Sequence, residues 1–221
     1  MKKFVQTLKY INLKTFYFNL KYFPFKQALK LPVLISKNVY LKEVSGKIHF
    51  DCPIRFGLIQ IGYGNVGIFD KKMSRTIWDV SGDVTFCGNA SIGHGSKIVV
   101  GPEGSLIFGE NLKITAESSL VAFNKIQIGN NCLLSWDTLL MDTDFHKVKN
   151  DNSEIINSPK PIFIGDNVWI GCRSVILKGS VIPNNSIIAI NSLVNKELLV
   201  GNCIYGGSPV RCLKENISWE E

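Results

Sequence analysis

The fold of this protein is decided by residues 164–193, which read IGDNVW IGCRSV ILKGSV IPNNSI IAINSL. An aliphatic residue opens each block of six, from Ile164 to Ile188, and Val194 opens the next block. A small residue stands four positions after each opening residue: Val168, Ser174, Ser180, Ser186 and Ser192. A six-residue period held over this length indicates a repeat architecture.

The period suits a triangular coil in which each hexad supplies one short strand and one turn. Three hexads then complete a rung of roughly 18 residues, and rungs stack at about 4.8 Å, the spacing between paired strands. The aliphatic residue points inward, the small residue fits the corner, and Gly or Asn tolerates the backbone angles of the turn. The sequence therefore predicts an all-β fold, a left-handed parallel β-helix, which is an exception to the rule of right-handed crossovers.

The same period recurs upstream with phase slips near 100–106 and 121–127. Phe86, Ile92 and Ile98 are six residues apart, and similar runs begin at Phe108 and Ile128. We therefore place the coil at 80–205. Residues 142–161 break the pattern and are polar, which predicts a loop extruded from the coil, and functional residues concentrate on such loops.

The flanking segments differ from the coil in composition. Residues 1–50 are rich in lysine and aromatic residues, and we expect one or two short helices there. Residues 51–79 are predicted to form irregular lead-in strands, and residues 206–221 a C-terminal tail that holds a turn and a short helix or strand.

Positive charge is concentrated at the N-terminus. Residues 1–42 contain nine lysines, nine of the 23 aromatic residues and no acid, whereas the other residues hold 16 Lys and Arg against 18 Asp and Glu. This composition favours contact with an anionic surface: membrane phospholipid, a lipid-linked sugar diphosphate or an acidic polysaccharide. The alternative is a trimer-supporting cap with solvated lysines. No nucleic-acid recognition motif accompanies the lysines, so nucleic acid is not an expected partner.

Lysines interrupt every apolar run before the ~18 residues of a membrane span, and they break a would-be secretory signal. Six scattered cysteines without a C-x-x-C pair favour small, mostly buried side chains in a reducing compartment. We expect a cytoplasmic protein that makes peripheral contact with the inner face of the membrane.

Three stretches resemble a known family. Residues 167–171 (NVWIG) with the hexads that follow, and residues 207–211 (GSPVR), resemble the C-terminal half of the hexapeptide-repeat acyltransferases, such as the galactoside, maltose and serine O-acetyltransferases. Residues 141–146 (MDTDFH) are similar to the D-x-D-x-H loop of the branch that modifies capsular and lipopolysaccharide sugars. The resemblance covers 80–213 well and 1–79 loosely. It implies a homotrimer with acetyl-CoA in the groove between adjacent coils, and a loop histidine reaching that groove.

His146 is the candidate general base. Transfer to a sugar hydroxyl needs a group that takes the hydroxyl proton during attack, and histidine titrates in the suitable range. Of the three histidines, His146 alone lies on the extruded loop, beside Asp142 and Asp144, either of which could orient its ring. His49 is interpreted as structural, and His94, at a coil turn, as structural or as an acceptor contact.

The remaining site residues follow from the resemblance. It implies an oxyanion donor near Gly171 or Cys172, a tunnel wall at Trp169, pantetheine contacts around Ala189 and Asn191, and phosphate contacts at Lys196 and Arg211. Trp136 is expected to line the acceptor pocket with His94. The chain departs from the family with Ile190-Asn191 in place of the common Gly-Ala, and with Asn195 in place of Thr.

We therefore expect an acetyl-CoA-dependent O-acetyltransferase acting on a sugar hydroxyl of a surface polysaccharide or its precursor. The alternatives are N-acetylation of an amino sugar and a non-catalytic scaffold or glycan-binding coil. A hydratase of the carbonic-anhydrase type would need three histidines on one metal, and only His94 could join His146, so no metal is expected.

Overall fold

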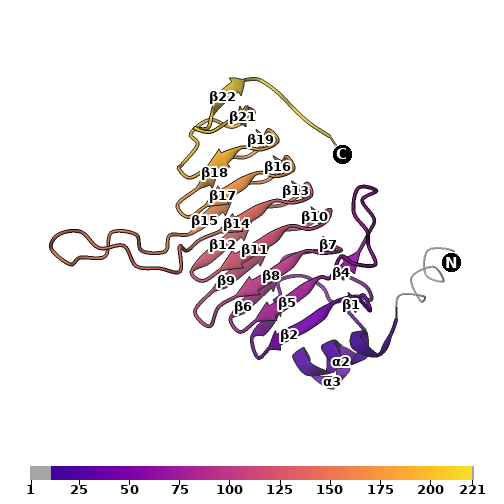
Figure 1. Ribbon diagram of the computed structural model, residues 1–221. Helices are drawn as coiled ribbons and strands as arrows, with labels where there is room; N and C mark the ends of the chain where they lie inside the picture. The colour runs from indigo at the N-terminus through magenta and orange to yellow at the C-terminus, as the bar shows by residue number, and fades with distance from the viewer. Residues whose placement is uncertain (1–10, 221) are drawn as a thin grey trace.

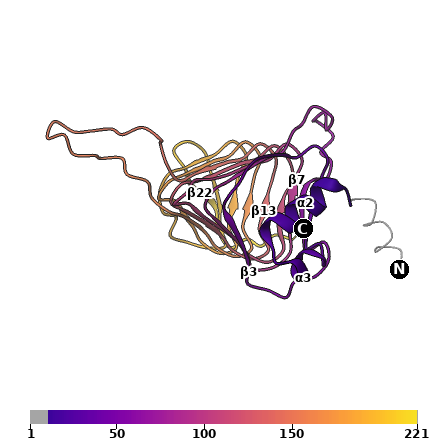
Figure 2. The ribbon, with the colours of Figure 1, turned by 90° about the horizontal axis from the view of Figure 1, so that it is seen from below.

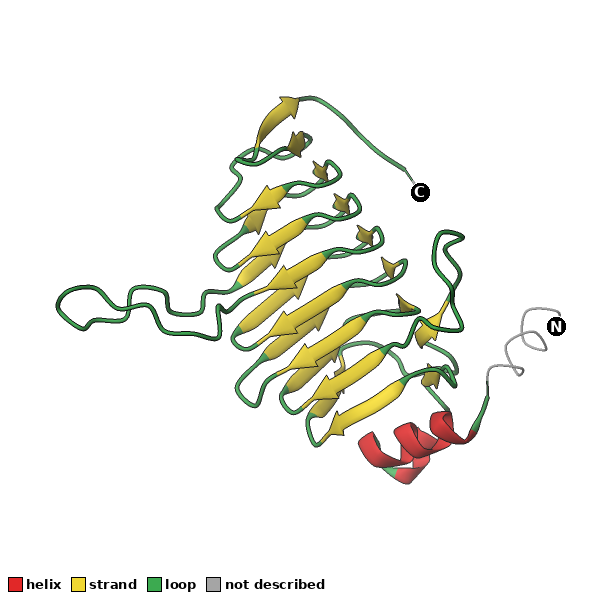
Figure 3. Cartoon of the chain, viewed as in Figure 1, coloured by secondary structure: helices red, strands yellow, loops and turns green. Residues whose placement is uncertain are grey.

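A computed structural model describes residues 11–220. In it the chain forms a triangular prism of stacked strands, with two short helices at its N-terminal end (Figure 1). Up to β20 the chain contributes one strand to each of three sheets in turn, and every neighbouring pair is parallel except the final pair of β21 and β22. The sheets belong to the left-handed parallel β-helix that the hexads predict. Figure 3 shows the loops gathered at the corners of the prism.

The three sheets, called A, B and C, form the faces of the prism. Sheet A contains β1 (Val33–Ile35), β4 (Ile59–Tyr63), β7 (Ala90–Gly93), β10 (Leu112–Ile114), β13 (Leu133–Leu134), β16 (Trp169–Ile170), β19 (Ile187–Ile188), β21 (Ile204–Gly206) and β22 (Arg211–Lys214). Sheet B contains β2 (Tyr40–Val44), β5 (Ile77–Val80), β8 (Lys97–Val100), β11 (Ser119–Ala122), β14 (Leu139–Met141), β17 (Val175–Leu177) and β20 (Leu193–Val194). Sheet C contains β3 (Lys47–Phe50), β6 (Asp83–Phe86), β9 (Ser105–Phe108), β12 (Lys125–Ile128), β15 (Ile162–Ile164) and β18 (Val181–Ile182).

The hexad aliphatic residues form the core and stack in register. Ile164 pairs with Ile182 in sheet C, as Ile170 pairs with Ile188 in sheet A and Ile176 with Val194 in sheet B. All of them are buried. Because these residues stack in register, each added rung extends one continuous core. Full burial of such a side chain stabilises the fold by about 1.5–3 kcal/mol.

The geometry of the corners explains why serine and asparagine recur at the other positions of the hexads. The serines are buried, and two of them bond to backbone carbonyls of the next rung: Ser174 Oγ donates to Ala189 O at 2.9 Å and Ser180 Oγ to Val194 O at 3.0 Å. Asn131, Asn167 and Asn185 have φ of 54–57°, a left-handed conformation that asparagine tolerates better than most residues. The Nδ2 of Asn167 also donates to Asn185 Oδ1 at 3.0 Å, which ties successive corners together.

The coil begins earlier than residue 80. Strands β1 to β5, within 33–80, lie in the same three sheets as the later strands, so the segment predicted as irregular lead-in forms regular rungs. Two stretches without strands, 51–58 and 64–76, interrupt the period there and hide it in the sequence. The phase slips upstream of the clean hexads coincide with the corners at 101–104 and 123–124.

Four features complete the description of the chain. Two short helices, α2 (Leu13–Tyr22) and α3 (Phe25–Ala28), lie in the N-terminal segment. The extruded loop 142–161 joins β14 to β15 and projects away from the prism (Figure 2). The tail contains β22, which pairs antiparallel with β21. All six cysteines are free, although only Cys132 and Cys203 are buried.

Helix α2 caps the open edge of sheet A. The Nδ2 of Asn19 donates to Val33 O at 2.7 Å, and the amide of Val33 donates to Asn19 Oδ1 at 3.2 Å. Thr15 exchanges two similar bonds with Ile35, at 3.1 and 3.3 Å. These polar side chains form hydrogen bonds with the backbone groups of an edge strand, which would otherwise be open to pairing with another chain. Within residues 11–220, no helix is long and apolar enough to cross a membrane.

We predict that Asn19→Ala loosens β1 without unfolding the coil. The substitution leaves the amide and carbonyl of Val33 without their partner, which costs about 1–3 kcal/mol for buried polar groups. Hydrogen exchange of the residue 33–35 amides should accelerate accordingly. Lys21→Ala, an exposed change on the same helix, is the control. Unchanged exchange in Asn19→Ala would contradict the capping role.

Candidate active site

The predicted site residues lie on two different edges of the prism. The loop with His146 leaves the B/C edge, between β14 of sheet B and β15 of sheet C. The A/B edge, where the chain passes from sheet A to sheet B, carries another set of predicted residues: His94, Trp136, Gly171, Cys172, Ala189 and Asn191. A single chain therefore does not bring His146 together with them.

Two further predicted residues lie elsewhere. Lys196 is exposed and follows β20, near the B/C edge, while Arg211 is exposed at the start of β22 in the hairpin that ends sheet A. The set predicted for the cofactor is thus distributed around the prism. Among residues 11–220, no group of three or more His, Cys, Asp or Glu is arranged to hold a metal ion.

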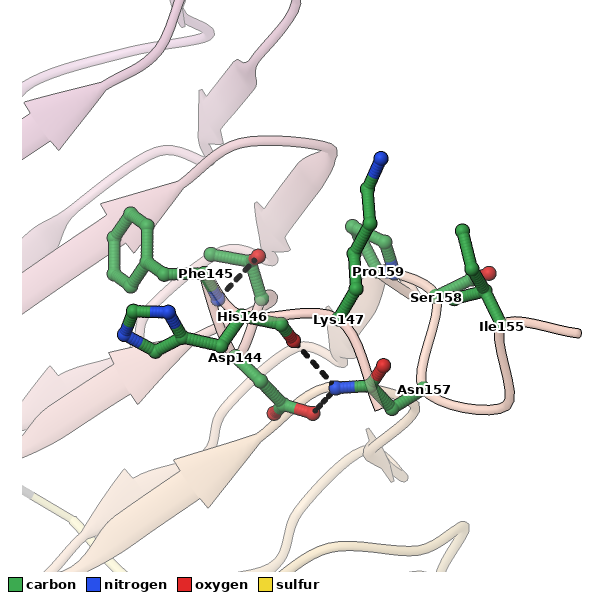
Figure 4. A pocket seen from close by; sticks show the side chains of 9 residues that line it. Asp144, Phe145, His146, Lys147, Ile155, Asn157, Ser158 and Pro159 are labelled. Carbon is green, nitrogen blue, oxygen red and sulfur yellow. Dashed lines mark hydrogen bonds between the residues drawn. The ribbon is translucent and has the colours of Figure 1, made fainter. Parts of the chain in front are cut away.

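The base of the extruded loop is braced by polar contacts (Figure 4). Asn157 Nδ2 donates to Asp144 Oδ2 and to the backbone oxygen of His146, both at 2.8 Å. Lys178 Nζ, from the next rung of the coil, reaches Asp144 Oδ2 at 2.5 Å and Asn157 O at 2.6 Å. The hydrogen bond from Lys178 lowers the pKa of Asp144, which favours its carboxylate form. The two legs of the loop are therefore fixed to each other and to the coil.

The imidazole of His146 is left free by this brace. The side chain is exposed, and its ring makes no hydrogen bond or ion pair within the described chain. Figure 4 shows the ring beside Phe145, away from the contact between Asp144 and Asn157. Phe145 has a φ of 61° and packs edge-on against Phe123 at 4.9 Å between ring centroids. Such a backbone conformation is unusual for a bulky residue and tends to occur at functional sites.

Asp142 does not orient His146. Its side chain is fully buried, and its two carboxylate oxygens accept the amides of Phe123 at 2.8 Å and Asn124 at 2.9 Å. Burial raises the pKa of Asp142, although these backbone bonds favour the ionised form. The prediction from sequence was wrong here because proximity in the chain did not reveal that the side chain turns inward to cap a corner.

Gly171 and Cys172 differ as possible oxyanion donors. The amide of Gly171 donates to Ile188 O at 2.8 Å in the ladder of the coil and is therefore occupied. The amide of Cys172, one residue further into the corner, has no acceptor within residues 11–220. Of the two, only Cys172 has a backbone donor available.

Trp169 lies on the outward face of sheet A. Its Nε1 donates to Ser135 Oγ at 3.0 Å, and its ring lies 5.9 Å from that of Trp219 in the tail. Trp219 in turn donates to Asn167 O at 2.8 Å. The half-buried Trp136 lies on the neighbouring corner, where its carbonyl accepts the amide of Arg173. The tail thus covers part of Trp169.

His94 anchors the loop formed by residues 64–76. The side chain is only 1% exposed; Nδ1 lies 2.7 Å from Ser74 Oγ, and Nε2 accepts the amide of Val66 at 3.4 Å. Ser74 also bonds Glu117, which pairs with Lys97 at 2.6 Å. Both ring nitrogens of His94 are engaged in these contacts, so the ring has no free nitrogen for the acceptor contact that the sequence also suggested.

Sequence reasoning missed the bracing residues. Asn157 lies in the irregular part of the loop and carries no periodic signal, and Lys178 occupies an ordinary corner position of a hexad. Their role depends on a contact between a loop and the following rung, which no local pattern encodes. Trp219 was missed for the same reason.

The hollow beside His146 is small. It measures about 170 Å³ and lies between the two legs of the loop, with Thr143, Phe145, Lys147 and Pro159 among its lining residues. Small-molecule sites usually measure about 300–1,000 Å³, so this hollow is too small for a large cofactor. A site at His146 that holds a large cofactor therefore needs further lining residues from outside this loop.

Comparison with known proteins gives the chain its relatives. No protein-family model matches it. An uncharacterized 24.8 kDa protein from the cps region of Klebsiella pneumoniae is 28% identical over 201 residues, which cover 89% of this chain and 85% of the relative. The polysialic acid O-acetyltransferase of Neisseria meningitidis is 38% identical over 104 residues, or 47% of this chain and 48% of the relative. The chain thus spans about half the length of that enzyme.

Among solved structures, the polySia-specific acetyltransferase NeuO superposes with a TM-score of 0.65 at 22% identity, over 86% of this chain and 76% of that chain. This likeness supports the fold. The sequence relatives supply the link to acetyl transfer.

We predict that the loop of residues 64–76 detaches as the pH falls. Burial lowers the pKa of His94 below its ordinary value of 6.5. The anchored state therefore binds fewer protons than the detached state, and its stability is complete above about pH 6.5 and declines below it. Hydrogen exchange of this loop, corrected for intrinsic rates, should reveal the loosening between about pH 7.5 and pH 5.5. In His94→Gln the pH dependence should flatten; a wild-type loop equally protected at both pH values would contradict the prediction.

Proposed function

We propose that this chain, which belongs to the hexapeptide-repeat acyltransferases, transfers an acetyl group from acetyl-CoA to a sugar hydroxyl of a surface polysaccharide or its precursor. The observation that carries the proposal is the brace around His146. It fixes the backbone of the residue on both sides and leaves the imidazole exposed and unpartnered within the described chain. A histidine whose backbone is held in place and whose imidazole is free to accept a proton suits the role of a general base.

In the proposed mechanism, His146 takes the proton of the acceptor hydroxyl as the oxygen attacks. Acetyl-CoA supplies the acetyl group as an activated thioester; as the new C–O bond forms, the C–S bond breaks, and CoA leaves as a thiol that carries the proton from His146. Asp144 acts as a positioning residue: it holds Asn157, which in turn holds the carbonyl of His146. Lys178 keeps the Asp144 carboxylate ionised and attached to the coil.

We propose that a second copy of the chain completes the site. His146 leaves the B/C edge, whereas the free amide of Cys172 lies at the A/B edge of the same chain. In a closed ring of three copies, the B/C loop of one can face the A/B edge of the next. The amide of Cys172 would then donate to the thioester oxygen as negative charge develops there.

The A/B edge offers features suited to acyl-CoA. The small side chain of Ala189 and the exposed Asn191 lie in the corner one rung above Cys172, where a pantetheine arm could run. Lys196 and Arg211 are exposed cations suited to CoA phosphates. Trp169 and Trp136 would line the cofactor and acceptor sides of the groove.

The relatives support the acceptor class. One is described as acetylating polysialic acid and another belongs to a cps region. We propose a hydroxyl of a related surface glycan as the acceptor, and the cytoplasm as the location, where acetyl-CoA is available.

We predict that His146→Ala lowers acetyl transfer by about 10²–10⁴-fold, the usual contribution of a general base. Release of CoA from acetyl-CoA can be followed with a thiol reagent, with polysialic acid and a panel of hydroxyl and amino sugars as acceptors. His49→Ala is the control, because His49 is an exposed residue on sheet C whose one polar side-chain contact within residues 11–220 is with Asp83, at 3.2 Å. Full activity in His146→Ala would remove the base from the mechanism.

A complementation experiment tests the shared site. His146→Ala and Ala189→Trp, which obstructs the A/B corner, should each be inactive alone. Co-expressed, they should recover about a quarter of the wild-type activity, because random assortment in a closed ring gives some sites two intact halves. Lack of recovery in mixed trimers would indicate that each site is built from one chain.

A further inference from the structure

Helix α2 presents four of its large apolar side chains to solvent. Its inward side carries Thr15 and Asn19, which cap the edge of β1, together with Phe18. Its outward side carries four large apolar residues at the i, i+3, i+4, i+7 spacing of a single helix face: Leu13, Phe16, Tyr17 and Leu20. This orientation follows from the need of the sheet edge for polar partners.

Helix α3 contacts α2, and its exposed apolar side chains lie at the same end of the prism (Figure 1). Phe25 and Leu29 are 67% and 63% exposed, and Leu13 on α2 is 87% exposed. We call these six side chains the N-terminal apolar face: Leu13, Phe16, Tyr17, Leu20, Phe25 and Leu29. Large apolar groups gathered at one end of a molecule mark an interaction surface more often than scattered ones do.

The surroundings of this face are basic. Lys21, Lys26, Lys30 and Lys37 are exposed and form no ion pair within residues 11–220. The first acidic residue of the whole sequence is Glu43, and three more lysines precede the described residues. A protein partner for such a face would have to be strongly acidic as well as apolar, whereas an anionic bilayer offers both properties at its interface.

We propose that the N-terminal apolar face docks on an anionic phospholipid membrane. The six apolar side chains enter the interface, while the lysines contact the headgroups. The helices lie at one end of the prism (Figure 1), so docking through them sets the coil on end. The rung of the extruded loop then stands four rung spacings, about 19 Å, beyond the first rung. The proposal rests on these helices alone and is independent of the acetyl transfer.

The test uses the full-length protein and sedimentation with two kinds of vesicle: phosphatidylcholine alone, and phosphatidylglycerol with phosphatidylcholine in equal parts. The protein should sediment with the anionic vesicles only, and salt at about 1 M, where the screening length is about 3 Å, should release most of it. Absence of binding to anionic vesicles at low salt would overturn the proposal.

Two pairs of substitutions separate the apolar and the charged contributions. Phe16→Ser with Leu20→Ser changes exposed side chains and should lower partitioning at least about ten-fold. Lys26→Gln with Lys30→Gln should lower it by about 25-fold, at about five-fold for each lysine near the surface.

Matched controls lie away from the face. Leu199→Ser with Leu213→Ser alters apolar side chains that are 82% and 54% exposed, and Lys72→Gln with Lys214→Gln removes two exposed charges. Both controls should bind like the wild type. If the Phe16 and Leu20 pair binds equally well, the face does not enter the membrane. If light scattering shows instead that this pair reduces the oligomer size, a second copy covers the face, and the proposal is overturned.

Discussion

The structure depends on the in-register stacking of inward-pointing aliphatic side chains from one rung to the next. Ile170 on Ile188 and Ile176 on Val194 each place one buried side chain directly over another, while parallel ladders connect the backbones. A residue added within a strand would turn every following side chain to the opposite face. Extra residues can therefore leave the coil only at a corner, which is where 64–76 and 142–161 lie.

This constraint also determines what a loop can do. A loop inserted at a corner begins and ends on strands of the coil, so these strands fix the positions of its two ends. The base of loop 142–161 is fixed further by Asp142, which is buried under the neighbouring corner, and by Lys178, which reaches across from the next rung. The backbone of His146 is therefore held in place, and none of the contacts that hold it involves the imidazole ring.

The triangular section has a second consequence, because features on different edges of one prism face in different directions. The exposed histidine and the amide of Cys172, which has no acceptor in the described part of the chain, are separated in this way. At the N-terminal end the same geometry leaves an open sheet edge, and α2 satisfies it with polar side chains. Four large apolar residues of that helix are then left on the outside, so one requirement of the fold creates the surface that we assign to the membrane.

The sequence by itself determined the β-helix, its inward residues, the corner serines and the extruded loop with its histidine, because each follows from a local six-residue period or its interruption. It did not reveal the first two rungs, where 51–58 and 64–76 interrupt the period. Only the tertiary structure decided that Asp142 caps a corner, that His94 anchors a loop, and that Asn157 and Lys178 brace His146. Those roles arise from contacts between rungs, and side-chain direction across rungs is set by packing rather than by neighbouring residues in the chain.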